Sequence, residues 1–140
     1  MKDQFDVQVE LYDIFSVSSG LLEALEIPGE TNEDILNNKI RRVMADTTVM
    51  TQDDVSTMPF FDYTFVPMRG QVNNFLVSKS TLEFNIYSST WSSISSIYKV
   101  LHNILQNPYE DAQIYYSGQG SSGITGAMRY VFRVHQLTKS

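Results

Sequence analysis

The chain has 140 residues, of which 42% are hydrophobic and 19% charged, so its composition is that of one folded domain and not of a disordered segment. It contains no cysteine, which excludes disulfides, thiolate metal ligands and cysteine nucleophiles. No stretch approaches the roughly 18 consecutive apolar residues of a membrane span, and the N-terminus lacks the apolar run of a signal peptide. We therefore expect synthesis in the cytoplasm and no membrane partner.

The net charge of −6 is unevenly distributed along the chain. Residues 1–36 carry nine acidic residues against one lysine, a net charge of −8, whereas the remainder carries +2. An acidic protein repels phosphate backbones, so the charge argues against tight DNA binding. The acidic segment fits either a solvated helix face or a surface that docks a basic partner.

The first part of the chain has a helical pattern. Apolar residues from Phe5 to Leu25 recur mostly at helical spacing, with an interruption around Ser16–Gly20. This predicts one helix, a break and a short second helix. Pro28–Gly29 then ends the unit.

Thr31 can cap a further helix, with Asp34 three residues later. The apolar positions that follow predict a helix over about 32–44. Residues 45–58 are polar and without a clear period, which predicts a loop that can hold one helical turn.

After Pro59 the pattern becomes that of strands. Phe61, Tyr63 and Phe65 alternate with polar residues, and a second strand is predicted over Phe75–Tyr87. Turn residues such as Arg69–Gly70 lie between them, so we expect an antiparallel hairpin.

The clearest helix of the chain follows, capped by Ser89 or Thr90 and stopped by Asn107–Pro108. Its apolar positions follow a spacing of three and four, which predicts a face packed across the sheet. These positions are Trp91, Ile94, Ile97, Tyr98, Leu101, Ile104 and Leu105.

Two more strands are predicted, over Ala112–Tyr116 and Met128–Leu137. In the second, alternation places one set of side chains toward the core and puts Arg129, Arg133 and His135 on the opposite face, as a basic stripe. The predicted fold class is α+β, a single domain over 1–140 with a mostly antiparallel four-stranded sheet and helices packed on one face.

Between these strands, "SGQGSSG" contains Gly118-Gln119-Gly120-Ser121-Ser122-Gly123, which fits the Gly-x-Gly-x-x-Gly pattern of dinucleotide sites. Such a site needs a helix after the glycines, because the helix amides meet the phosphate. A strand pattern follows instead. We interpret Gly118–Gly126 as a long flexible hairpin loop, ordered only against a neighbouring subunit.

No catalytic arrangement stands out. His102 and His135 have no metal-ligand neighbours in sequence, Asp53–Asp54 and Glu110–Asp111 lie in predicted turns, and no Gly-x-Ser-x-Gly motif occurs. We expect a protein that is not an enzyme, with no cofactor and no metal site.

Four stretches taken together carry a resemblance to a known family. They are "LYDIFSVSSGLLEAL", "MPFFDYTFV", "LEFNIYSSTWSSISSIYKVLHNILQ" and "MRYVFRVHQLT". Their order and lengths resemble the tail-terminator or tail-to-head joining proteins of long-tailed, siphovirus-like bacteriophages, over nearly the whole chain.

The resemblance implies a structural virion protein that forms a homo-oligomeric ring, commonly a hexamer, on the head-proximal end of the tail tube. The ring would end tube polymerisation and present the surface for head-tail joining. Its partners would be the tail tube protein and the head-tail connector proteins, with viral DNA only passing through the lumen. The alternatives are another neck component, such as a head-completion or stopper protein, and a small nucleotide-binding enzyme.

In such a ring each subunit needs two different complementary surfaces. We expect the acidic segment 1–36 to meet the basic face of a neighbour. The residues predicted at this subunit or partner interface are Gly118, Gly120, Gly123, Gly126, Arg129, Arg133, His135 and Arg69.

Overall fold

A five-stranded sheet organises the fold in the computed structural model, which describes residues 4–27, 33–42, 52–65, 81–106 and 113–135. The strand order is β1-β2-β3-β5-β4. Neighbouring strands are antiparallel except β1, which runs parallel to β2 at one edge. The strands are β1 (Ile40–Arg42), β2 (Phe60–Phe65), β3 (Thr81–Ser88), β4 (Gln113–Ser121) and β5 (Met128–His135).

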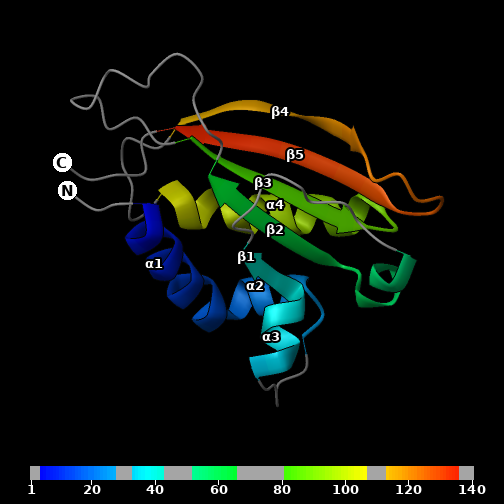
Figure 1. The fold of residues 1–140 in the computed structure, drawn as a ribbon, viewed down its shortest axis with the longest axis horizontal. Coiled ribbons are helices and arrows are strands. Elements are labelled where there is room, and N and C mark those ends of the chain that lie inside the picture. Colours follow the sequence, from blue (N-terminus) through cyan, green and yellow to red (C-terminus); the bar gives the residue numbers. More distant parts are fainter. Residues whose placement is uncertain (1–3, 28–32, 43–51, 66–80, 107–112, 136–140) are drawn as a thin grey trace.

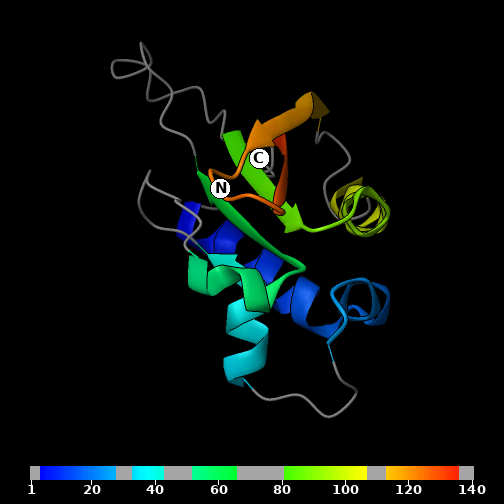
Figure 2. The ribbon, with the colours of Figure 1, turned by 90° about the vertical axis from the view of Figure 1, so that its right-hand side faces the viewer.

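Helices cover one face of this sheet (Figures 1 and 2). The long helix α4 (Trp91–Gln106) lies across it, and α1 (Gln4–Val17) and α2 (Ser19–Ala24) pack beside α4 on the same side. The short helix α3 (Glu33–Lys39) contacts β1 and β2 at the edge of the sheet, and the 3-10 helix η1 (Gln52–Thr57) lies on the other side. The α+β class with helices packed on one face is confirmed.

The fifth strand corrects the predicted four-stranded sheet and the predicted helix over 32–44. The helix ends at Lys39, and residues 40–42 form β1. Ile40 lies opposite Phe61 and is 1% exposed, so an extended backbone buries it as well as a helix would. The helical spacing of apolar residues could not distinguish these two solutions, because a three-residue strand has too little pattern of its own.

The other predicted helices are confirmed, together with the break between the first two. Ser18 separates α1 from α2. Its Oγ accepts a hydrogen bond from the Leu21 amide at 3.4 Å, which caps α2. The cap of α4 is Thr90, whose Oγ1 accepts from the Ser93 amide at 3.3 Å. The predicted helical turn within 45–58 is η1.

The core lies between the sheet and the helices, with Phe15 of α1 at its centre. Its ring meets Phe61, Tyr63 and Phe84 edge-on at centroid distances of 5.4, 5.5 and 6.1 Å. From α4 the predicted face is buried at Ile94, Ile97, Leu101 and Leu105. Each such side chain stabilises the fold by about 1.5–3 kcal/mol when fully buried.

Trp91 does not follow this prediction. Its side chain is 43% exposed, so it is not a core residue. Trp91 is the first residue of α4, at the end of the predicted apolar stripe.

The two hairpins are confirmed, but the second has a much shorter loop than predicted. β4 continues to Ser121, so Gly118 and Gly120 are paired strand residues opposite Val131 and Arg129. Only residues 122–127 form the connection. The loop is shorter than predicted because backbone hydrogen bonds to β5 extend β4 through its glycines. Strand pairing uses main-chain groups, so residues without bulky side chains can take part in it.

Several predicted features lie outside the described residues. They include the turn with Arg69, the first part of the strand predicted from Phe75, and the end of the last strand at Leu137. Within the described ranges β3 begins at Thr81 and β5 ends at His135.

Candidate interaction surface

The face of the sheet opposite α4 carries a cluster of polar side chains, which we call the polar face. Alternation along β2, β3 and β5 places these side chains on one side, while their neighbours in sequence enter the core. The polar face consists of Asp62, Glu83, Asn85, Arg129 and Arg133.

A hydrogen-bonded chain crosses three strands of this face. Arg129 donates from Nε and Nη2 to Asn85 Oδ1, at 2.9 and 2.6 Å. Asn85 in turn donates from Nδ2 to Asp62 Oδ1 at 2.8 Å. Asp62 and Asn85 are 3% and 0% exposed, so this chain holds a carboxylate deep in the protein.

Two ion pairs flank the chain. Arg133 Nε lies 3.0 Å from Glu83 Oε1, and these residues are direct partners across β3 and β5. On the other side, Arg41 Nη1 lies 2.9 Å from Asp54 Oδ1, and the Arg41 guanidinium stacks 3.9 Å above the Phe60 ring. Both pairs have partly exposed side chains, so each contributes little to stability.

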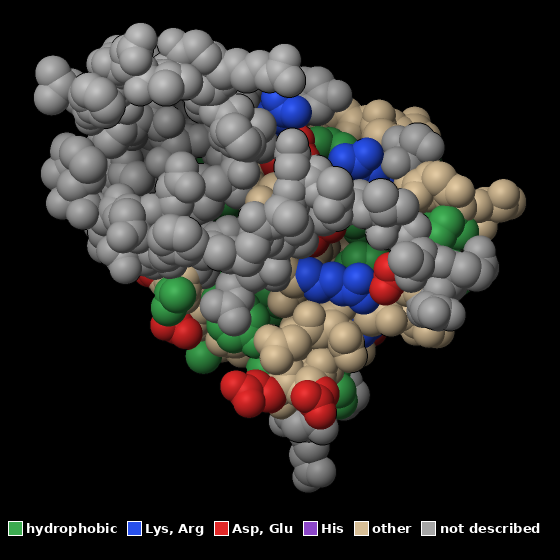
Figure 3. Space-filling model, viewed as in Figure 1, with side chains coloured by type: hydrophobic (Ala, Val, Ile, Leu, Met, Phe, Trp, Pro, Cys, Tyr) green, Lys and Arg blue, Asp and Glu red, His purple; other side chains and the backbone are tan. Residues whose placement is uncertain are grey.

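The predicted basic stripe is therefore balanced by acidic side chains. Around the polar face the described residues include three arginines and three carboxylates, so the region is neutral when all are ionised. Figure 3 shows basic and acidic side chains close together on this side of the molecule.

Burial changes the ionisation of two groups here. Desolvation raises the pKa of Asp62 to about 6, although the bond from Asn85 and the charge of Arg129 act in the opposite direction. Desolvation, helped by the charge of Asp62, raises the pKa of Tyr87 to about 12. Tyr87 is thus neutral over the ordinary pH range, whereas Asp62 changes its charge within it.

The turn of the last hairpin is tied to the body of the protein. Ile124 and Ala127 pack against Phe60 and Tyr87, whose rings stack at a centroid distance of 4.9 Å. Ser122 Oγ accepts from the Ile124 amide at 3.1 Å and lies 2.7 Å from the Ala127 carbonyl oxygen, to which it can donate. These contacts occur within one chain, and the expectation that Gly118–Gly126 is ordered only against a neighbouring subunit stays a prediction.

The four predicted glycines play two different parts. Gly123 and Gly126 have φ angles of 78° and 88°, in the left-handed region where glycine is favoured, and they shape the turn. Gly118 and Gly120 lie in β4. A Cβ atom on Gly120 would come within 3.2 Å of Arg129 Cδ, whereas one on Gly118 would meet nothing within 4 Å.

The structure places Gly118 and Gly120 opposite Val131 and Arg129 of β5, and the role of these glycines and arginines at a subunit interface stays a prediction. The backbone of His135 ends β5 opposite Gln113, and Arg69 lies outside the described residues. Sequence reasoning missed Asp62, Glu83 and Asn85. Their signal was present, because each is a polar residue at an alternate position of a strand whose other positions are apolar.

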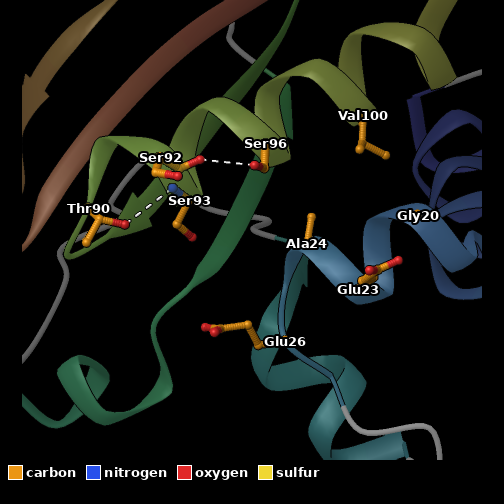
Figure 4. A pocket seen from close by; sticks show the side chains of 9 residues that line it. All are labelled: Gly20, Glu23, Ala24, Glu26, Thr90, Ser92, Ser93, Ser96 and Val100. Atoms are coloured by element: carbon orange, nitrogen blue, oxygen red, sulfur yellow. Dashed lines mark hydrogen bonds between the residues drawn. The ribbon is translucent and has the colours of Figure 1, made fainter.

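A second surface feature is a groove of about 530 Å³ between α2 and α4 (Figure 4). Ala24 and Val100 project into it from the two helices, and Glu23 and Glu26 line the α2 side. Two of its hydroxyl groups are bonded to the backbone of α4, because Ser96 Oγ donates to the Ser92 carbonyl oxygen at 3.0 Å and Thr90 Oγ1 caps the helix.

The glycine pattern does not form a phosphate cradle. Gly118 and Gly120 are in β4, and the element after the pattern is β5, so the pattern opens no helix. Within the described ranges no group of three or more histidine, aspartate or glutamate side chains is placed to hold a metal ion. None of the helices in these ranges is long and apolar enough to cross a membrane. His102 is partly buried beside Tyr98, at the boundary predicted for it.

Comparisons of the chain with protein-family models, with curated proteins and with solved structures gave no match.

Proposed function

We propose that this chain is a structural subunit of a ring at the head-proximal end of a bacteriophage tail tube. The ring ends polymerisation of the tube and offers the surface for head-tail joining. The proposal combines the resemblance of the four sequence stretches with one structural observation, the chemistry of the sheet edge at β4.

β4 supports an assembly role because, within the described ranges, no further strand pairs with its outer edge and its sequence lacks the residues that usually protect an edge. Exposed edges are commonly blunted by charged residues, proline or short length, since unpaired backbone groups otherwise recruit another strand. The nine residues of β4, QIYYSGQGS, include neither a charged residue nor proline. A register irregularity between Ile114 and Tyr116 interrupts only its beginning.

The two edges of the sheet also differ, as subunit contacts in a ring require. A head-to-tail ring joins two different surfaces of each chain. Here β4 forms one edge, while the other is the three-residue β1 with Arg41 beside it. A contact made by β4 is therefore directional, and we expect an extended segment of a neighbour to pair with it.

Electron microscopy of the purified protein, alone and with tail tubes of the phage that encodes it, tests this proposal. We expect rings at one end of each tube and tubes of uniform length. Long tubes with bare ends in the presence of saturating protein would contradict the proposal.

A matched pair of variants tests the role of β4. Gln119→Lys adds a charge at an exposed position of this strand, and Asn103→Lys adds the same charge at an exposed position of α4. We expect Gln119→Lys to abolish ring formation on tubes while Asn103→Lys retains it, with both variants folded by circular dichroism. Equal ring formation by the two variants would exclude β4 from the contact.

A further inference from the structure

The groove between α2 and α4 exists because both helices turn short side chains toward it. On each helix, the residue one position before a buried leucine or isoleucine lines the groove. These residues are Gly20 and Ala24 on α2, and Ser96 and Val100 on α4. A Cβ atom on Gly20 would reach Val100 Cγ1 only at 3.9 Å. The helices therefore leave a space of about 530 Å³, a volume in the range of small-ligand sites.

The walls of this groove differ in chemistry (Figure 4). Ala24 and Val100 project apolar side chains into it from the two helices. The α2 side carries the exposed side chains of Glu23 and Glu26. On the α4 side, the Ser96 hydroxyl is already bonded to the backbone of its own helix at 3.0 Å. The groove thus offers apolar contacts beside carboxylates.

The carboxylates determine the sign of the charge that an occupant meets. The described residues that line the groove include Glu23, Glu26 and no cation. The start of α4 has the opposite sign, but a helix N-terminus carries only about half a charge. One of its amides, that of Ser93, is also satisfied by Thr90 Oγ1 at 3.3 Å. The groove therefore favours a cationic occupant.

The chain itself places an ammonium group close to this end of α2. Lys39 Nζ donates to the Leu25 carbonyl oxygen at 3.0 Å. Burial lowers the pKa of Lys39, and the charge of Glu26 acts in the opposite direction, so the two charged groups attract each other. Lys39 is not among the residues that line the groove. This contact shows which chemistry the end of α2 accepts, and it leaves the groove itself open.

We propose that the groove between α2 and α4 binds a lysine or arginine side chain from a basic segment of a partner protein. Such a side chain has an aliphatic stem and a cationic head, and the groove has a place for each. The stem lies on Ala24 and Val100, while the head meets Glu23 and Glu26. A purely apolar side chain would bring no charge to these carboxylates, and an acidic one would be repelled.

Nuclear magnetic resonance of the full chain, with ¹³C-labelled alanine and valine methyl groups, tests this proposal. The probe is the peptide hexalysine, and hexaglutamate of the same length is the control. We expect the signals of Ala24 and Val100 to shift saturably with hexalysine and to stay constant with hexaglutamate. Hexalysine shifts that leave out both methyl signals would overturn the proposal.

Two double variants separate the groove from the general acidity of the protein. Glu23→Gln with Glu26→Gln removes both carboxylates from the groove. Glu33→Gln with Asp34→Asn removes two exposed carboxylates from α3, outside the groove lining. We expect the first pair to weaken hexalysine binding about tenfold and the second pair by less than about twofold. Equal losses would show that hexalysine recognises only the overall charge.

A third variant tests the shape of the groove at constant charge. Ala24→Leu places a larger side chain where the stem of the occupant should lie. We expect the folded variant to lose the hexalysine shift of Val100, and unchanged affinity would overturn the proposal. If Ala24→Leu fails to fold, the double variants still decide the matter, because they hardly change side-chain volume.

The groove goes beyond the proposed ring, because the titration uses the isolated chain and a peptide. Failure of the ring experiment leaves the titration unaffected. A chain that forms rings but does not bind hexalysine would retain the ring proposal and exclude this use of the groove.

Discussion

Arg129 reaches diagonally from β5 to β3 and donates two hydrogen bonds to the single side-chain oxygen of Asn85, at 2.9 and 2.6 Å. Its direct partner on β3 is Tyr87, two residues away from Asn85. Because both donors meet Oδ1, the Asn85 amide nitrogen is directed toward Asp62. Arg129 thus orients the group that holds Asp62, and the three side chains act as one unit.

Gly120 makes room for this arrangement on the neighbouring strand. A Cβ atom there would lie 3.1 Å from Val131 Cγ2 and 3.2 Å from Arg129 Cδ, and Val131 is buried and β-branched. We predict that Gly120→Ala lowers the free energy of unfolding by about 1 kcal/mol, through overpacking. Urea unfolding measures this change.

Gly118→Ala is the matched control for this prediction. The same Cβ atom would meet nothing within 4 Å, and the position is also in β4. We expect no loss of stability, because the added methyl group restricts the unfolded chain without a clash. Equal losses of stability in the two variants would show that β4 needs glycine for its backbone conformation. They would contradict the idea that Gly120 makes room for the Arg129 side chain.

The raised pKa of Asp62 predicts how stability depends on pH. The pKa is 3.8 for an ordinary aspartate and about 6 in the folded protein, so the folded state binds the proton more tightly. This contribution is fully present below about pH 4 and is lost as the pH rises through 6. The difference corresponds to about 3 kcal/mol in the free energy of unfolding.

Asp62→Asn removes this dependence. We predict that the variant gains stability relative to the wild type on going from about pH 4 to about pH 7, by on the order of 3 kcal/mol at most. Chemical unfolding of both proteins at the two pH values gives the comparison. Asp54→Asn removes the partly exposed carboxylate that pairs with Arg41. We expect no such gain in this variant. A stability difference between Asp62→Asn and wild type that does not change with pH would contradict the assignment.

Much of the fold could be predicted from the sequence because its elements have strong periods. The apolar stripe of α4 continues from Ile94 to Leu105, and the alternation in β2 and β5 fixes which side chains enter the core. β1 could not be predicted in this way. It has three residues, and Ile40 satisfies either a helical or an extended pattern.

The candidate surface could be predicted only in part, because the pattern within one strand does not show which strand lies beside it. Alternation placed Arg129 and Arg133 on one face, but it gave no information on which strand lies beside β5. Only the order β2-β3-β5-β4 brings Asn85 and Glu83 next to these arginines and neutralises the stripe. Tertiary pairing, and not local sequence, decides the charge of this face.

The cap of α4 is another feature for which the sequence offered two candidates. The Ser93 amide donates to Thr90 Oγ1 at 3.3 Å, which satisfies one of the free amides at the start of the helix. We predict that Thr90→Ala lowers the free energy of unfolding by about 1 kcal/mol, whereas Ser89→Ala has little effect. Thermal unfolding of both variants tests this, and a larger effect of Ser89→Ala would transfer the cap to that residue.

Glu26 occupies a backbone conformation that suits glycine, so a substitution here is expected to stabilise the protein, unlike Thr90→Ala. Its φ angle is 58°, in the left-handed region, where it closes α2 with a bond from its amide to the Glu23 carbonyl oxygen at 3.0 Å. A side chain in this region costs about 1 kcal/mol, so we predict that Glu26→Gly raises the free energy of unfolding by about that amount.

Glu23→Gly makes the same chemical change three residues earlier, inside α2, where glycine is unfavourable by about 1 kcal/mol. We therefore expect opposite shifts of the melting temperature in the two variants, measured at the same pH and ionic strength. Both variants remove one negative charge from the groove between α2 and α4, so a purely electrostatic effect would shift both in the same direction. A gain confined to Glu26→Gly thus identifies the backbone conformation at that residue as its cause.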